Sequence, residues 1–307
     1  GGSFDPFEMF EQMFHEGGAG GEGGGSSFRC STSGGGFPGG GGFPGGGGFP
    51  GGGFGQQQAP RQDIFPKETP NLTKLGSPKF PDSNSKNLWL IIFYTNHSQE
   101  CRHAQPQIET LADKVRESFK VGAMDCGKNE KETAYCEKLG VDMGALPAFG
   151  FVVDGKVEFY DPSAQRPSAK DLHEFAMENM PKHLVVNINH PKQIDERLLS
   201  NNNQDAVLLL TDKYETSGMY YSIAYKYRKS FVFGESRAKN LNLAKELSVK
   251  KYPLLLAFVP AGVGDERYQS VDVIKYAGSM TSKAISKWLD SVSKKIKARR
   301  KPGREDF

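Results

Sequence analysis

Apolar positions along residues 87–181 recur with the periods of strands and helices in turn, and this pattern predicts an α/β domain. The run NLWLIIFY at 87–94 is continuously apolar, as in a buried strand. After it, residues 107–118 carry apolar side chains at helical spacing, from Ile108 to Val115. The remaining predicted elements are a strand at VGAMDC, a helix at KETAYCEKLG, strands at AFGFVVDG and KVEFYD joined by an Asp-Gly turn, and a helix at AKDLHEFAMENM. The predicted order is β-α-β-α-β-β-α.

The same order of elements repeats in the last third of the chain. The repeat consists of strands at LVVNIN and AVLLLTD, a helix at TSGMYYSIAYKYR, a strand at SFVFGES, a helix at NLNLAKELSV, strands at LLLAFVP and DVIKYAG, and a helix at KAISKWLDSVSKKI. Because each unit has its own apolar strands and covering helices, each can bury its own core. We therefore predict two tandem domains, at 68–181 and 182–293. Residues 61–86 are expected to contain a linker and a first, short strand near Leu72.

The first 60 residues have a different composition. Most of the 37 glycines of the chain lie there, many of them in a Gly-Gly-Gly-Gly-Phe-Pro repeat around Phe37, Phe43 and Phe49. Glycine loses the most backbone freedom on ordering, and the tract has almost no aliphatic side chains to bury in return. Residues 1–60 are therefore predicted to be disordered.

Charge and hydropathy argue against several classes of function. The net charge of +3 at pH 7 is too small to indicate a nucleic-acid partner, and the basic run 294–304 is expected to belong to a solvated basic tail, 294–307. No stretch approaches the roughly 18 to 20 consecutive apolar residues that a membrane helix needs. The four cysteines are too few for a disulfide scaffold and lack the spacing of a zinc site, so we expect neither a metal nor a cofactor.

One segment combines a strand end, a cysteine and a proline within a short distance. Phe93-Tyr94 ends the apolar strand, Cys101 lies near the start of the next helix, and Pro106 follows five residues later. This segment resembles the active-site region of the thioredoxin and protein disulfide isomerase family, in which Cys101 takes the place of the second cysteine of a Cys-x-x-Cys motif and Pro106 that of the proline that bends the helix. Further similar motifs are Asp125-Cys126, Cys136 to Val141, Leu146-Pro147 and, in the second unit, Val249 to Pro253. The resemblance implies two thioredoxin-like folds and a cis-proline at Pro147.

The catalytic position of this motif is altered. In the family the first cysteine lies at a helix N-terminus, where the helix dipole favours the nucleophilic thiolate. Ser98 takes that place here, and a serine hydroxyl can neither attack a disulfide nor form one. The buried acid that the family places six residues before the first cysteine is replaced by Ile92, and the preceding tryptophan by His97. Together these changes predict that dithiol oxidoreduction has been lost.

The other cysteines and histidines leave several alternatives. Cys101 is expected to be a buried and inert thiol, and the alternative is a monothiol oxidoreductase that acts through Cys101 in mixed disulfides. His97 and His103 are expected to be solvated, because no orienting third group or oxyanion hole accompanies them. By the family resemblance, Cys126 and Cys136 either form a structural disulfide or remain two core thiols.

The second unit contains no cysteine, and its corresponding loop is polar and rich in tyrosine. It resembles the non-catalytic domains of the isomerases, which present a binding surface. We predict that Tyr214, Met219, Tyr220 and Tyr221, together with Pro253, line a groove for exposed apolar segments. The alternative for any one of them is a place in the core.

The N-terminal region resembles a second family. Residues 4–14, FDPFEMFEQMF, place three phenylalanines at helical spacing ahead of the glycine-rich tract. An Asp-Pro-Phe phrase that opens a Gly/Phe-rich region is similar to the segment after the J domain in DnaJ-type co-chaperones. The J domain itself is missing from the sequence, because its only His-Pro pair, His190-Pro191, is followed by Lys192 rather than by aspartate. The alternative is a generic glycine-rich linker.

Together the two resemblances imply a DnaJ-type co-chaperone that binds unfolded polypeptides and assists a heat-shock-70-type chaperone through a J domain absent from this chain. Its thioredoxin-like domains would be redox-inactive, so we do not expect an enzyme. The same combination implies the lumen of the endoplasmic reticulum, with the cytoplasm as the alternative. Asn71 and Asn96 fit the acceptor pattern for N-glycosylation. Neither a membrane nor nucleic acid is expected as a partner.

Overall fold

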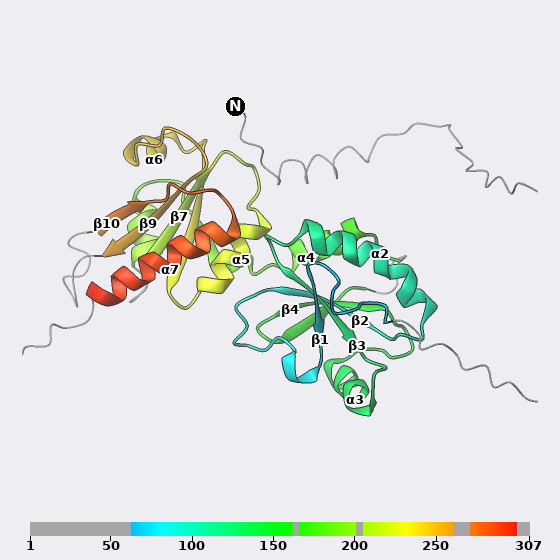
Figure 1. Ribbon diagram of the computed structural model, residues 1–307. Coiled ribbons are helices and arrows are strands. Elements are labelled where there is room, and N and C mark those ends of the chain that lie inside the picture. The colour runs from blue at the N-terminus through cyan, green and yellow to red at the C-terminus, as the bar shows by residue number, and fades with distance from the viewer. Residues whose placement is uncertain (1–62, 162–165, 201–204, 261–270, 300–307) are drawn as a thin grey trace, which may run out of the picture. The chain divides into compact units, whose positions relative to one another are not determined.

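Two α/β domains make up the part of the chain that the computed structural model describes, residues 63–161, 166–200, 205–260 and 271–299 (Figure 1). Each domain contains a five-stranded mixed sheet with helices packed on both faces. This arrangement confirms the prediction of two tandem thioredoxin-like domains. The predicted disorder of residues 1–60 concerns a segment outside the described residues.

The first domain follows the predicted order of elements. These are β1 (Leu72–Leu75), a short 3-10 helix η1 (Ser77–Lys79), β2 (Trp89–Tyr94), α2 (Gln99–Lys114), β3 (Lys120–Asp125), α3 (Glu130–Leu139), β4 (Ala148–Val153), β5 (Lys156–Phe159) and α4 (Ala169–Glu178). The strand order in the sheet is β1-β3-β2-β4-β5. Strands β1, β3 and β2 are parallel, whereas β4 and β5 run antiparallel to their neighbours.

The second domain repeats this topology. Its elements are η2 (Lys182–Leu184), β6 (Val185–Asn187), η3 (Ile194–Leu199), β7 (Asp205–Thr211), α5 (Gly218–Tyr227), β8 (Phe231–Arg237), α6 (Leu241–Glu246), β9 (Leu254–Pro260), β10 (Val271–Lys275) and α7 (Ser282–Arg299). The sheet order β10-β9-β7-β8-β6 mirrors that of the first domain, element by element.

Helix α7 extends further than the sequence predicts. It runs to Arg299, and Ile296 is buried in the core of the second domain. The first residues of the predicted basic tail, 294–307, are therefore helical rather than part of a solvated tail. Residues 300–307 lie outside the described part of the chain.

The continuous apolar run of β2 is explained by burial on both of its faces. Leu90 and Ile92 point into the core beneath α2 and α4, whereas Ile91 and Phe93 point into the core that α3 covers. Successive side chains of a strand alternate between the two faces of a sheet, so a central strand covered on both sides needs no polar positions. Strand β7 is buried in the same way in the second domain.

Helix α5 joins the two domains. Tyr225 belongs to the second domain by sequence, yet it is 1% exposed and lies in the core cluster of the first domain. At the start of the helix, a Cβ added to Gly218 would lie 2.8 Å from Met177 Sδ and 3.1 Å from Ser118 Oγ. The helix approaches the first domain so closely there that a larger residue at 218 would require the Met177 side chain to move.

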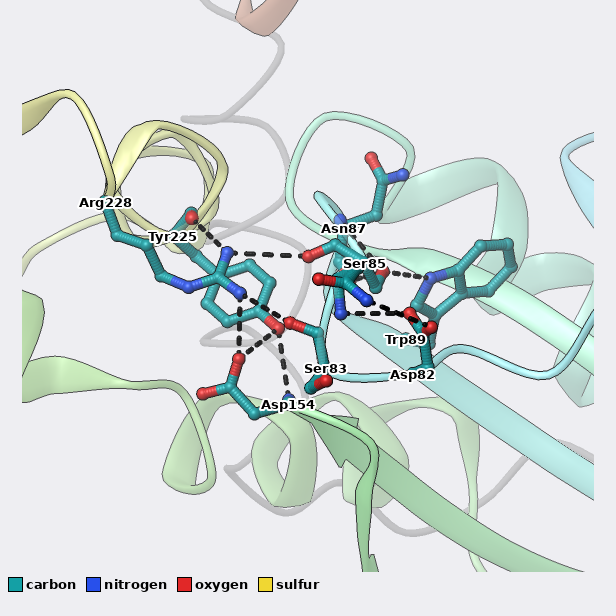
Figure 2. A network of polar contacts seen from close by, with 9 residues as sticks. Asp82, Ser83, Ser85, Asn87, Trp89, Asp154, Tyr225 and Arg228 are labelled. Atoms are coloured by element: carbon teal, nitrogen blue, oxygen red, sulfur yellow. Dashed lines mark hydrogen bonds and ion pairs between the residues drawn. The ribbon is translucent and has the colours of Figure 1, made fainter.

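A polar network around Arg228 extends this contact (Figure 2). Arg228 stacks on the ring of Tyr225 at 3.8 Å, and its Nη2 donates to Asp154 Oδ1 at 2.8 Å. The hydroxyl of Tyr225 donates to the same Asp154 oxygen at 3.0 Å. Asp154 lies in the Asp-Gly turn between β4 and β5, with a positive φ of 52°. Arg228 also donates to the carbonyl oxygens of Ser83 and Ser85, so it bonds two separate segments of the first domain.

Candidate functional site

The altered motif lies at the carboxyl end of β2, where α2 begins. Ser98 is the N-cap residue of α2, and its Oγ accepts a hydrogen bond from the backbone N–H of Cys101 at 3.3 Å. This bond satisfies one of the N–H groups that the first turn of a helix leaves without a partner. The pairing of Phe93 with Ala148 places the cis-proline Pro147 beside the same end of β2. Ser98 therefore stabilises the helix end at which the family has its nucleophile.

Cys101 is a free thiol with 0% of its surface exposed. It lies in one core cluster with Ile92 and Ile108, between the sheet and helix α2. Ile92 is itself 1% exposed and supplies only hydrocarbon where the family has a buried acid. A thiol can exchange with a disulfide only if the disulfide reaches it. The folded domain gives no such access to Cys101.

Residues just before β1 cover this region of the first domain. Ile64 and Phe65 are 2% and 0% exposed and belong to the same core cluster as Cys101. The backbone N–H of Ile64 donates to Asn96 Oδ1 at 2.9 Å, and the ring of Phe65 meets that of Tyr94 edge to face at 5.1 Å. The composition of residues 61–86 predicts a linker here, but Ile64 and Phe65 are part of the folded domain. The adjacent apolar pair in an otherwise polar segment is the signal that could have identified them.

A polar cluster anchors the loop that contains the altered motif. Asp125, at the end of β3, accepts hydrogen bonds from Asn96 Nδ2 at 2.8 Å and from the Gly127 N–H at 3.0 Å. Burial raises the pKa of the Asp125 carboxyl, and the Gly127 N–H and the charge of Lys74 oppose that shift. Sequence reasoning gave Asp125 no role beyond its place in a motif. In the structure it fixes Asn96 and hence the path of the loop.

Tyr94 connects this cluster to the upstream segment. Its hydroxyl donates to Asp63 Oδ1 at 3.0 Å, and Asp63 also forms an ion pair with Lys74. Burial raises the pKa of Tyr94 well above its ordinary value, and the nearby charge of Asp125 raises it further. The phenol therefore stays protonated and acts as a hydrogen-bond donor. It holds the covering segment in place and carries no charge into the site.

Cys126 and Cys136 are joined by a disulfide, with their Cα atoms 5.9 Å apart. Both are completely buried, in the core on the α3 side of the sheet. Of the two alternatives that the family resemblance left open, the structure contains the bonded pair. Cys101 lies in the core on the other face of the sheet, so the disulfide and the free thiol are separate. The bond ties the end of β3 to α3 and has a structural role.

The two glycosylation candidates differ in accessibility. Asn71 is exposed, and its Nδ2 donates to Asp113 Oδ1 at 3.1 Å on the surface. Asn96 is half-buried, and both of its amide atoms are used in hydrogen bonds, to Asp125 and to Ile64. A glycan on Asn96 would replace one of the two amide hydrogens at a half-buried position, whereas Asn71 is exposed, and glycosylation of either residue stays a prediction.

The tyrosine-rich residues of the second domain do not share one open surface. Tyr214 is 92% exposed, whereas Tyr220 is 2% exposed and donates its hydroxyl hydrogen to the Gly234 carbonyl at 2.7 Å. Met219 and Tyr221 are partly buried against the core, and Tyr221 packs against the cores of both domains. The core alternative therefore holds for Tyr220. Only Tyr214 is fully open to a partner.

An ion pair in β8 holds the loop of the second domain that precedes α5, where a redox motif would lie. Glu235 is 4% exposed, and its Oε1 accepts from Arg237 Nη2 at 2.9 Å and from the hydroxyl of Thr216. Arg237 also donates to the Lys213 carbonyl at 3.0 Å, which holds the loop between β7 and α5. The cis-proline Pro253 directly precedes β9 at this same end of the sheet.

Within the described ranges, no helix is both long and apolar enough to cross a membrane. No cluster of histidine, cysteine, aspartate and glutamate in those same ranges could hold a metal ion.

Comparison with protein families identifies the first domain. Residues 79–178 match the family model for thioredoxin. Among solved structures, the crystal structure of ERdj5 form II is similar over 74% of this chain and 30% of its own, at 14% identity and a TM-score of 0.41.

Two curated proteins are related in sequence. A Dictyostelium discoideum protein that carries the name protein disulfide-isomerase is 24% identical over 223 residues, covering 69% of this chain and 49% of that protein. The DnaJ protein ERDJ3A of Oryza sativa subsp. japonica is 27% identical over 177 residues, covering 55% of this chain and 29% of that protein. The chain thus spans about half the length of the first relative and less than a third of the second.

Proposed function

We propose that the two thioredoxin-like domains of this chain hold unfolded clients without exchanging their disulfides. The premise is that residues 79–178 match a thioredoxin domain and that the chain is related to proteins named as a disulfide-isomerase and as a DnaJ protein. The client would pass to a heat-shock-70-type chaperone through a J domain. The observation that supports the redox-inactive role is that a hydroxyl, Ser98, caps α2 while the one free thiol of the described residues, Cys101, is buried.

The alternative is a monothiol oxidoreductase that acts through Cys101, and the relative that is named as an isomerase favours it. The two functions differ in whether Cys101 reacts in the native protein. A Cys30→Ala background leaves Cys101 as the free thiol, because Cys126 and Cys136 are bonded to each other. In this background we expect insulin reduction at the level of the buffer and slow labelling by iodoacetamide, because labelling requires local opening of the core.

The matched variant is Ser98→Cys in the same background. It places a thiol at the N-terminus of α2, where the helix favours thiolate. We expect fast labelling at position 98 and no change in the far-UV circular dichroism spectrum. Insulin turnover by the unaltered Ser98 protein, or labelling of Cys101 as fast as that of the added thiol, would support the oxidoreductase instead.

Client binding would use the open end of the second domain. Tyr214 is 92% exposed there, and a large aromatic side chain can contribute much contact area at little entropic cost. We expect Tyr214→Ser to lose about half of the protection that the protein gives to a thermally aggregating test protein such as citrate synthase. Leu241→Ser is the matched control, because Leu241 is also exposed, at 74%, and lies at the start of α6. Equal protection by the two variants would contradict a role for Tyr214.

The lumen of the endoplasmic reticulum is the proposed compartment. The buried disulfide between Cys126 and Cys136 supports it, because such bonds persist in oxidising compartments and are rare in the cytosol. Non-reducing peptide mapping of acid-quenched cell extracts should find this pair bonded in nearly all molecules. A mainly reduced pair would favour the cytoplasm.

A further inference from the structure

A cavity of about 130 Å³ lies at the opposite end of β2 from Ser98. Residues from both domains line it, including Lys86, Arg116, Glu117, Lys120, Lys226 and Ser282. Lys86, Arg116 and Glu117 belong to the segments that precede β2 and β3, Lys120 is the first residue of β3, and the last two belong to helices α5 and α7. The wall also contains a direct contact between the domains, in which the hydroxyl of Ser222 donates to the carbonyl of Ser118.

The charge of the lining is strongly one-sided. Four cationic side chains, those of Lys86, Arg116, Lys120 and Lys226, line the cavity with the one carboxylate of Glu117, and Arg116 also pairs with Asp113 at 4.0 Å outside the lining. The Glu117 carboxylate is already used, because its Oε2 accepts the backbone N–H of Ser282 at 2.7 Å, at the start of α7. Like charges around a small space repel one another, and a bound anion would offset this repulsion.

The cavity is held in shape by contacts around it. Lys226 Nζ donates to Ser286 Oγ at 3.0 Å and lies 5.2 Å from the centre of the Tyr227 ring, so its ammonium group has a defined position. The backbone N–H of Lys120 donates to the Leu88 carbonyl at 2.9 Å, which fixes the start of β3. A preformed arrangement loses little conformational entropy when a ligand binds.

We infer that this cavity is a binding site for a phosphate-type oxyanion that bridges the two domains. Lysine ammonium groups bind phosphate as point charges, and an arginine can add two parallel hydrogen bonds. The volume is enough for several water molecules and hence for a tetrahedral oxyanion with part of its hydration shell. The group could be free phosphate or the phosphoryl group of a phosphorylated polypeptide, since both offer the same oxygens.

Thermal unfolding in inorganic phosphate, against sodium chloride of equal ionic strength, tests the site. Phosphate also stabilises proteins because it is excluded from their surface. A comparison of two variants therefore separates this general effect from binding in the cavity. The cavity variant is Lys120→Gln with Lys226→Gln. The control is Lys138→Gln with Lys245→Gln, which removes the same charge from exposed positions outside the cavity lining, one in each domain.

Specific binding should raise the Tm of the unaltered protein and of the control by about 2 to 4 °C. The cavity variant should lose most of this shift while its circular dichroism spectrum stays unchanged. An equal rise in all three proteins would overturn the proposal.

Fluorescence anisotropy with a labelled phosphoserine peptide and its unphosphorylated form identifies the source of the group. Binding of the phosphopeptide alone, abolished in the cavity variant, would assign the site to phosphorylated chains. A phosphate-dependent Tm shift without peptide binding would assign it to the free anion. Absence of both effects would exclude an oxyanion site in this cavity.

Discussion

At the scale of single residues, Ser98 and Cys101 show how folding and chemistry separate in this chain. The Ser98 hydroxyl accepts the N–H of Cys101 and so caps α2, a role in which serine is among the best residues. The oxygen therefore favours the fold although it cannot act as a thiolate. Cys101, one turn into the helix, contributes a small apolar side chain to the core.

His173 gives a prediction at the same scale. Its ring lies in α4 beside that of Phe119, and burial lowers its pKa from 6.5 to about 4. The folded protein therefore binds this proton less readily than the unfolded chain, so the free energy of unfolding should fall as the pH drops from about 6.5 towards 4. Because the ring is only partly buried, we expect a loss of about 1 to 2 kcal/mol over that window.

The measurement is urea unfolding at several pH values, for the unaltered protein and for His173→Gln. The variant lacks this titration. As the pH falls, its unfolding free energy should therefore rise relative to that of the unaltered protein. A difference that does not change between pH 7 and pH 4 would contradict the cited pKa shift.

At the scale of elements, the sequence predicted most strands and helices better than it predicted what each one contacts. Two departures are α2, which begins at Gln99 and not at 107, and η3, which was not predicted. The pattern of apolar positions placed β2 and α3 correctly. A strand buried on both faces is continuously apolar, whereas a helix buried on one face has apolar residues at helical spacing. Helix α5 was expected to present tyrosines to clients. In the structure, Tyr220 belongs to its own domain and Tyr225 to the core of the neighbouring one.

The disulfide that joins the end of β3 to α3 is expected to stabilise the first domain. Cys126 and Cys136 are ten residues apart in sequence, and the bond limits the freedom of that loop in the unfolded chain. The double substitution Cys126→Ala, Cys136→Ala should lower the free energy of unfolding by about 2 to 3 kcal/mol. Urea unfolding under non-reducing conditions measures this difference in unfolding free energy. Added reductant should lower the unfolding free energy of the parent protein and leave that of the variant unchanged. A variant as stable as the parent would show that the bond does not constrain the unfolded chain.

At the scale of the described molecule, α5 and Arg228 couple the two domains (Figure 2). Arg228 bonds Asp154 and two backbone carbonyls of the first domain while it stacks on Tyr225. The Arg228 side chain is 15% exposed and that of Asp154 is 52% exposed, so water partly screens this ion pair. These contacts should make the two domains unfold together.

Replacing Arg228 by alanine tests this coupling. We expect a loss of roughly 2 kcal/mol, because the hydrogen bonds of a charged group are removed. The chain has two tryptophans, Trp89 in β2 and Trp288 in α7, so fluorescence of single-tryptophan forms follows each domain separately. The two unfolding curves should coincide in the parent and separate in Arg228→Ala. Arg197→Ala is the control, since Arg197 bonds the Asn187 carbonyl within the second domain. Coincident curves in both variants would contradict coupling through Arg228.

The site was predictable from sequence as far as its chemistry depends on residue identity. The sequence alone shows that Ser98 stands in place of the nucleophile and that Ile92 stands in place of the buried acid. The adjacent apolar pair Ile64-Phe65 indicates a buried segment, but its partners could not be predicted. Its contacts with Asn96 and Tyr94 cross about thirty positions and follow no local period.

The sequence by itself determined two α/β domains of one topology and a thiol motif without its nucleophile, because side-chain period and atom type are local properties. Only the tertiary structure decided that Cys101 is shielded from solvent, that Cys126 and Cys136 are bonded, and that Tyr225 lies in the core of the neighbouring domain. Burial and pairing depend on which distant segments meet, and apolar contact is non-directional, so the residues alone do not specify those partners.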